Sequence, residues 1–100
     1  MQVKINSVHF KADKKLETFI EQKIDKLTSF YDGIIGGEVS LKVSNKADRE
    51  NKITEIRLKI RGYDLFAKKE SNTFEEATDQ AVDALKKQLT KHKEKVRKKY

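Results

Sequence analysis

Basic residues crowd the last fifteen positions of the chain and form its strongest chemical signal. Residues 86–100 hold a single acid, Glu94, and eight bases: Lys86, Lys87, Lys91, Lys93, Lys95, Arg97, Lys98 and Lys99. The formal net charge of +7 therefore lies in this segment, and residues 1–85 are formally neutral. A helix C-terminus needs only about two or three cations to offset its dipole. The excess indicates a polyanionic partner, with nucleic acid first and an anionic membrane second.

Residues that could catalyse a reaction or hold a metal are sparse. The chain has no cysteine, and it lacks the nucleophile elbow, the P-loop and the HExxH zinc motif. Glu75, Asp79 and Asp83 share one helical face, but a solvated face near a helix N-terminus explains them better than a metal site does. His9 and His92 have no second ligand recognisable nearby. We therefore predict a protein that is not an enzyme and uses no metal or other cofactor.

The elements that position these bases must come from one small domain. A chain of 100 residues is enough for one compact unit and too short for two. Charged residues make up 39% and the mean hydropathy is −0.82, but the 36% apolar content is clearly periodic, which argues against disorder. No segment resembles a signal peptide or reaches the roughly 18 apolar residues that cross a membrane. We expect one cytoplasmic domain over residues 1–100.

The first third of the chain predicts a strand followed by an amphipathic helix. Residues 2–8 alternate in the manner of a strand. Asp13 can cap a helix that runs to about residue 31, and Gly33 can end that helix in a left-handed conformation, so the glycines of residues 32–37 mark a helix stop and turn rather than a phosphate cradle. Lys23 interrupts the apolar stripe, so its ammonium must reach water. The stripe comprises Leu16, Phe19, Ile20, Ile24, Leu27, Phe30 and Tyr31.

Three strands are predicted in the middle of the chain. Residues 38–44 and 53–61 alternate between apolar and polar types, with a polar turn between them. Gly62 suits a tight turn into a further strand at about residues 63–68. In the first of these strands the residues expected to point inward are Val39, Leu41 and Val43.

A long helix is predicted to follow. Thr73 and Glu76 fit a capping box for a helix that begins at Phe74 and continues almost to the end of the chain. The element order β-α-β-β-β-α predicts a two-layer α+β fold, in which two helices pack on one face of a four-stranded, mostly antiparallel sheet.

The faces of this last helix separate by charge. Its inward stripe is predicted to comprise Phe74, Ala77, Ala81, Leu85, Gln88, His92 and Val96. Two basic ridges flank the stripe: one comprises Lys86, Lys93 and Arg97, and the other comprises Lys87, Lys91, Lys95 and Lys98. A helix of about 39 Å is longer than a domain with a radius of gyration near 13 Å, so the basic end should project.

Several segments, taken in order, resemble the hibernation-promoting factors, a bacterial family also described as sigma-54 modulation proteins, which silence ribosomes. The strongest match is QLTKHK at 88–93, within VDALKKQLTKHKEKVRKK at 82–99. Upstream matches are KIDKL at 23–27, FYD at 30–32 and VSLKV at 39–43. The inferred element order is also that of the family, so the resemblance covers essentially the whole chain.

The resemblance implies a function and a set of contact residues. It implies binding to the small ribosomal subunit in the channel for messenger RNA and transfer RNA, where the protein would block translation by steric occlusion. The matching bases, implied to contact ribosomal RNA phosphates, are Lys23, Lys26, Lys87, Lys91 and Lys93. On charge grounds we add their neighbours Lys86, Lys95 and Arg97.

The sequence departs from the family pattern at a few points. Ala84 stands where relatives commonly carry Lys, so one contact is lost or displaced to Lys86, and Phe74 stands where Tyr is usual. The second, dimerising domain of the long form is absent from these 100 residues, so we expect a monomer away from the ribosome. Pairing of ribosomes would then need a helper that resembles ribosome modulation factor.

Other functions remain open at this stage. A free-standing double-stranded RNA-binding module also packs two helices on a sheet, although the chain has no separate loop with a basic cluster. A protein-interaction or membrane-surface module would use the last helix as an amphipathic basic segment, but the apolar face at its basic end is poor for insertion. The exposed sheet face is a second possible RNA surface, with the bases Lys42, Arg57, Lys59 and Arg61 tempered by Glu38 and Glu55.

Overall fold

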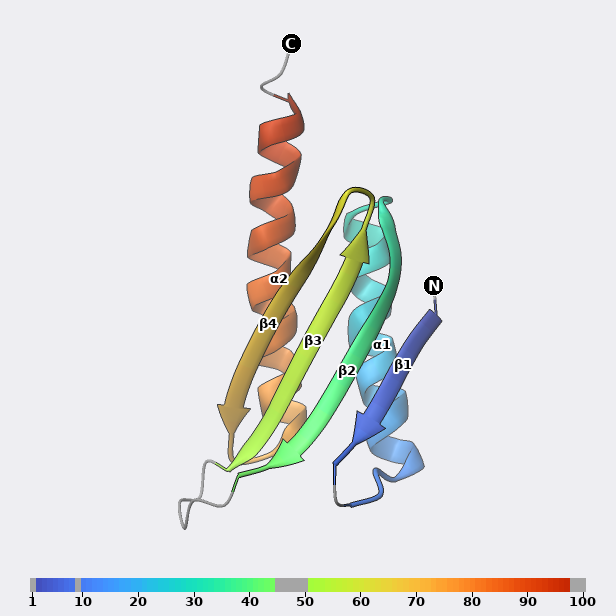
Figure 1. Ribbon diagram of the computed structural model, residues 1–100, viewed down its shortest axis with the longest axis vertical. Helices are drawn as coiled ribbons and strands as arrows, with labels where there is room; N and C mark the ends of the chain where they lie inside the picture. The colour runs from blue at the N-terminus through green and yellow to red at the C-terminus, as the bar shows by residue number, and fades with distance from the viewer. Residues whose placement is uncertain (1, 9, 45–50, 98–100) are drawn as a thin grey trace.

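The computed structural model describes residues 2–8, 10–44 and 51–97, without the side chains of Gln2, Tyr63 and residues 95–97. The predicted order of elements is confirmed (Figure 1). The strands are β1 (Gln2–Ser7), β2 (Ile34–Val43), β3 (Lys52–Ile60) and β4 (Tyr63–Ser71), and the helices are α1 (Lys14–Phe30) and α2 (Phe74–Arg97). Most of the polar turn expected before β3 lies outside the described residues.

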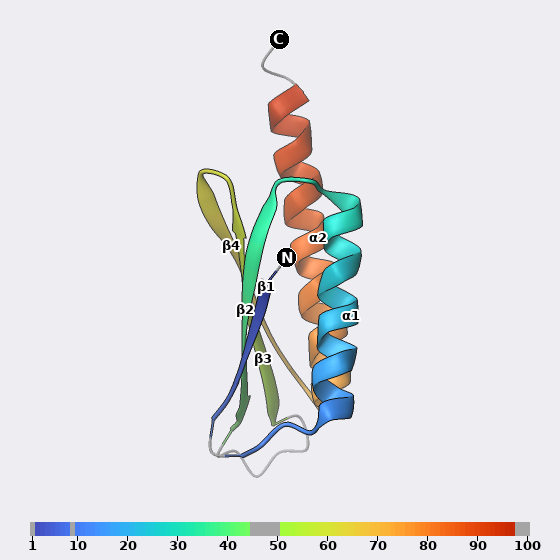
Figure 2. The same ribbon diagram turned by 90° about the vertical axis from the view of Figure 1, so that its right-hand side faces the viewer.

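The four strands form one mixed sheet in the order β1-β2-β3-β4. β1 runs parallel to β2, whereas β2 with β3 and β3 with β4 are antiparallel. The parallel pair needs a crossover, which α1 supplies. Both helices cover the same face of the sheet and leave the other face open (Figure 2), so the predicted two-layer α+β class is confirmed.

The core lies between the helices and the covered face of the sheet. Its buried side chains come from alternate strand positions and from one stripe of each helix. The fully buried large residues are Ile20, Ile24, Leu27, Val39, Leu41, Ile56, Leu58, Leu85 and Leu89. Val43, predicted to point inward, is instead 46% exposed because it is the last residue of β2.

Local signals fix the starts of both helices. The backbone amide of Leu16 donates to Asp13 Oδ1 at 2.8 Å, which confirms Asp13 as the N-cap of α1. The amide of Glu76 donates to Thr73 Oγ1 at 3.1 Å at the start of α2. Between β3 and β4, Gly62 takes a φ of +101°, as the predicted tight turn requires.

The glycines after α1 do not act as predicted. α1 ends because Tyr31 is extended, and Gly33 is not left-handed. A Cβ on Gly33 would lie 2.5 Å from the Tyr31 ring, so this glycine is needed for space. Gly36 and Gly37 lie inside β2, which begins four residues earlier than predicted, because pairing with β1 and β3 outweighs the weak strand preference of glycine.

The last helix is as long as predicted, but its buried stripe is partly different. Leu89 is fully buried, whereas the predicted inward residues Gln88 and His92 are only partly buried. Gln88 Nε2 donates to the Phe66 carbonyl at 3.0 Å, which satisfies its amide at the edge of β4. The helix rises about 36 Å over 24 residues, and its C-terminal end extends past the tip of the sheet (Figure 1). The longest dimension of the molecule is 51 Å.

Candidate RNA-binding surface

A groove of about 380 Å³ lies where α1 and α2 meet. Leu27, Phe30 and Val82 form its apolar lining, and Asp79 and Asp83 contribute carboxylates from α2. Three of the predicted RNA-binding residues line the same groove, namely Lys23, Lys26 and Lys86. The fold therefore brings together cations that are about sixty residues apart in the chain.

Phe30, at the C-terminal end of α1, contacts two lysines on the side of α2 that faces α1. The Nζ atoms of Lys86 and Lys93 lie 5.4 Å and 4.6 Å from the centroid of its ring. Lys93 Nζ also donates to the Phe30 carbonyl at 3.2 Å. A cation at this carbonyl complements the dipole of α1, and the ring attracts both ammonium groups. Lys86 and Lys93 thus occupy one ridge, as predicted.

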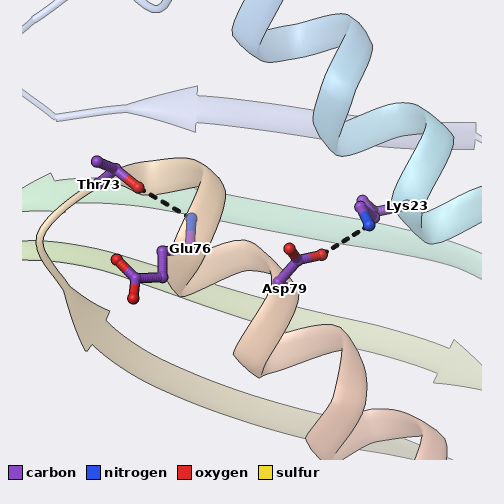
Figure 3. A network of polar contacts seen from close by, with 4 residues as sticks. All are labelled: Lys23, Thr73, Glu76 and Asp79. Atoms are coloured by element: carbon purple, nitrogen blue, oxygen red, sulfur yellow. Dashed lines mark hydrogen bonds and ion pairs between the residues drawn. The ribbon is translucent and has the colours of Figure 1, made fainter.

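Lys23 crosses the boundary between the helices. Its Nζ lies 2.8 Å from Asp79 Oδ1 (Figure 3) and 5.4 Å from the centroid of the Phe19 ring. The Lys23 side chain is 27% exposed, so its ammonium is paired and partly covered rather than simply solvated. Asp79 therefore does more than contribute to the solvated acidic face that its spacing predicts.

A second aromatic contact holds α2 beside the end of α1. The rings of Tyr31 and His92 pack edge to face, with centroids 5.5 Å apart and an interplanar angle of 83°. Gly33 leaves the space that the Tyr31 ring occupies. Because His92 belongs to the last third of α2, this contact anchors the helix near the point beyond which it projects.

The second ridge points away from α1. Lys87 and Lys91 are exposed, and neither has an acidic partner among the described residues. Lys95 and Lys98 of this ridge fall outside the described side chains, and so does Arg97 of the first ridge. The exposed members of this ridge are free to contact phosphate oxygens.

The open face of the sheet also carries bases, but acids lie beside them. Lys42 Nζ is 2.7 Å from Glu55 Oε2, and Lys59 Nζ is 3.2 Å from Glu38 Oε1. The hydrogen bond and charge of Lys59 lower the pKa of Glu38 below its ordinary value, with a further contribution from Arg57. The carboxylate of Glu38 thus stays charged and offsets the bases beside it.

Sequence inspection missed the roles of Phe30 and Asp79. Phe30 fits an apolar stripe and Asp79 fits an acidic first half of α2, so each has a sufficient local explanation. Only the packing of α1 against α2 places Phe30 beneath two lysines and Asp79 beside Lys23. Helix periodicity shows which side of each helix carries Lys23 and Asp79. It does not show how far α1 is shifted along α2, and this shift decides whether the two side chains meet.

The arrangement suits a polyanion that follows the helical layer. Lysines in the groove, on the Phe30 ring and on the second ridge offer donors to several phosphates. Within the described part of the chain, no helix combines the length and apolar character needed to cross a membrane.

Curated relatives share most of this chain. It is 30% identical over 97 residues to a protein named ribosome hibernation promoting factor from Klebsiella oxytoca, covering 97% of this chain and 98% of that protein. Identity to the protein of the same name from Pseudomonas putida is 32% over 95 residues, covering 95% and 89%. A ribosome hibernation promotion factor from Bacillus subtilis is 26% identical over 100 residues, but the chain spans only 52% of that protein.

Two solved structures have the same fold as this chain, and a family model matches most of its length. A ribosomal subunit interface protein from Coxiella burnetii has the same fold, with a TM-score of 0.82 and 20% identity over 93% of this chain and 98% of that one. The N-terminal domain of Protein Y from Thermus thermophilus has a TM-score of 0.79 and 22% identity, over 92% and 99%. The family model matches residues 3–97, and the chain belongs to the Sigma 54 modulation protein / S30EA ribosomal protein family.

Proposed function

We propose that this protein is a ribosome hibernation factor that binds the small ribosomal subunit and occupies the channel for messenger RNA and transfer RNA. Occupancy alone would inhibit translation, because the protein and the natural ligands cannot share the space. Family membership supports the proposal, as do the names of relatives that this chain covers over nearly their whole length. The protein would then act in the cytoplasm, where ribosomes are.

The observation that carries this proposal is the unbalanced positive charge of the helical layer. Lys26, Lys86, Lys87 and Lys91 have no acidic partner among the described residues. They lie on α1 and on the C-terminal half of α2. The last turns of that helix extend past the tip of the sheet (Figure 1). Ribosomal RNA is a dense polyanion, and contacts of cations with phosphates supply a large share of the binding free energy in complexes of proteins with nucleic acids.

We assign the predicted contact residues to two parts of this surface. The first part would bind one segment of RNA backbone through the groove residues Lys23, Lys26 and Lys86 and through Lys93 and Arg97 of the first ridge. The second part is the other ridge, which would bind a second segment through Lys87, Lys91 and Lys95. The cation–π contacts of Phe30 and the edge-to-face contact of Tyr31 hold α2 against α1. The two parts therefore keep a fixed spacing, which suits a folded RNA better than a flexible one.

We propose that residues 1–100 need a further component to pair ribosomes. The Bacillus subtilis relative is about twice as long as the region that this chain matches, and the Klebsiella oxytoca relative is not. We propose that residues 1–100 act as a monomer away from the ribosome. Pairing of two ribosomes would then require a helper that resembles ribosome modulation factor.

Co-sedimentation with separated ribosomal subunits tests the proposed function. The purified protein is mixed with small or large subunits in moderate salt with Mg²⁺, and initiator transfer RNA or messenger RNA is added as competitor. We expect stoichiometric binding to the small subunit alone, reduced by either competitor. Binding to neither subunit would overturn the proposal, and parallel assays with RNA duplexes and anionic liposomes would then test the two remaining functions.

A further inference from the structure

The ion pair between Lys23 and Asp79 joins the two helices at the proposed RNA-binding groove. Lys23 belongs to α1 and Asp79 to α2, and their charged atoms are 2.8 Å apart (Figure 3). The two residues line the same groove as Lys26 and Lys86. An acid inside a surface that binds phosphates repels the ligand, so its presence there needs a physical reason.

Lys23 is held from two sides. Asp79 accepts from its ammonium on the α2 side, and the ring of Phe19, one turn earlier on α1, lies 5.4 Å away. An ammonium has three N–H donors, so a donor remains for a ligand in the groove. Because the side chain is already held in place, less of its rotamer freedom is lost when a ligand binds.

The backbone that carries Asp79 is fixed by the structure around it, although the Asp79 side chain is 54% exposed. The first turn of α2 is capped by Thr73, whose Oγ1 accepts from the Glu76 amide at 3.1 Å (Figure 3). The neighbour of Asp79, Thr78, is fully buried with its hydroxyl 3.4 Å from that of Thr54 on β3. The carboxylate therefore projects from a part of the helix that is anchored to the sheet.

The ion pair also cancels the charge of Lys23 toward any polyanion that does not enter the groove. Lys26 lines the same groove without an acidic partner among the described residues, so it attracts every polyanion. We propose that Asp79 is a positioning residue that makes Lys23 selective: it orients the ammonium for a phosphate that fits between the helices and withholds its charge from other nucleic acids. This inference rests on the proposed function, and it explains how the RNA-binding surface discriminates between ribosomal RNA and other nucleic acids.

The variant Asp79→Asn tests this inference, because it keeps the shape of the side chain and removes its charge. Affinity is measured for the small ribosomal subunit and for a random-sequence RNA duplex of about 20 base pairs in the same buffer. One added net charge corresponds to about fivefold tighter duplex binding near 0.15 M salt. We expect this gain for the duplex and no gain, or a loss, for the subunit, so that selectivity falls at least about fivefold.

Asp83→Asn is the matched control. Asp83 lies one turn further along α2 and lines the same groove, but its carboxylate has no ion pair among the described residues. This variant adds the same charge without releasing a lysine, so both affinities should rise together and selectivity should not change. Asp79→Glu should restore the ion pair and most of the selectivity. Circular dichroism of each variant checks that the fold is kept.

The outcomes separate the inference from the function on which it rests. Equal gains for subunit and duplex in Asp79→Asn would mean that Asp79 acts only through net charge, which overturns the inference. Unchanged affinities for both would overturn it as well. If the wild-type protein does not bind the small subunit, the proposed function fails and the inference fails with it. If the wild type binds and selectivity is unaltered in Asp79→Asn, the inference alone fails.

Discussion

Both faces of this molecule carry lysines and arginines, but they differ in how these charges are balanced. On the open face of the sheet, Lys42 and Lys59 each lie beside a glutamate. On the helical layer, Lys87 and Lys91 have no acidic partner among the described residues. We therefore expect the unpaired cations of the helical layer to attract a polyanion more strongly than the paired cations of the sheet do.

The difference originates in local sequence. Strand pairing places Glu38 opposite Arg57 and Glu55 opposite Lys68, so opposite charges become neighbours across the sheet. In the second half of α2, Glu94 is the single acid among many bases. Pairs at helical spacing cannot neutralise that segment. We therefore expect the helical layer to bind RNA and the sheet face to remain unoccupied.

Salt should reveal the largest effect. If the helical layer neutralises about six phosphates, small-subunit affinity should fall on the order of 1,000-fold between about 50 and 200 mM salt, on the scale known for duplex DNA. Binding titrations at several salt concentrations with constant Mg²⁺ measure this slope. A flat response would contradict phosphate recognition and would favour a protein surface as the partner.

Charge reversal at Lys87 and Lys91 tests whether the helical layer binds RNA. The double variant Lys87→Glu/Lys91→Glu should weaken subunit binding on the order of 100-fold, because two phosphate contacts become repulsive. Both side chains are exposed, so the fold should be kept. Co-sedimentation gives the affinity.

The matched control makes the same change of net charge on the other face. Lys42→Glu/Lys59→Glu should weaken binding far less, since these lysines lie beside glutamates on the sheet. If the control loses binding and the α2 variant does not, the RNA-binding site lies on the sheet.

Removing the Phe30 ring tests whether this aromatic side chain supports both the fold and RNA binding. Phe30→Ala should lower the free energy of unfolding by about 2 kcal/mol, since the ring is partly buried. It should also weaken subunit binding several-fold, because Lys86 and Lys93 lose the ring that holds them. Denaturant titration and co-sedimentation measure the two effects.

Phe66→Ala is the control for this pair of effects. Phe66 is 49% exposed on the open face of the sheet, so its removal should cost less stability and leave binding unchanged. Equal losses of binding in the two variants would mean that an aromatic on the sheet face also contacts RNA.

The smallest effect concerns the ion pairs of the sheet. Lys59 lowers the pKa of Glu38 below its ordinary value of 4.5, so the pair stabilises the fold above that pH and loses its contribution as the pH falls through the lowered pKa. Glu38→Gln should therefore be slightly less stable than the wild type at pH 7, and the difference should shrink as the pH falls below 4.5 through the lowered pKa. A difference that does not change with pH would show that charge is not the cause.

Much of the fold could be predicted because local signals agree with tertiary structure. Periodicity gave the element order, and Asp13 and Thr73 marked both helix starts. Family membership confirms the prediction that the chain is not an enzyme. The burial of Leu89 and the strand position of Gly36 could not be predicted, because they depend on how elements pack and pair.

The candidate site was predictable only in part. Clustered charge identified the bases of α2, and the grouping of Lys86 with Lys93 followed from helical spacing. The pairing of Lys23 with Asp79 depends on how far α1 is shifted along α2, which no local pattern encodes. The contact residues themselves stay predictions until binding is measured.

The parallel pairing of β1 with β2 bears on how this chain folds as it is synthesised. Gln2 pairs with Gly36, so the strand made first has no partner until all of α1 and the start of β2 have left the ribosome. β2 pairs with β3 and β3 pairs with β4, and no helix separates the strands of either pair. Each of these strands therefore waits less time for its partner to be synthesised. Contacts between distant residues form slowly. We expect β1 to dock late, onto a sheet that is already assembled.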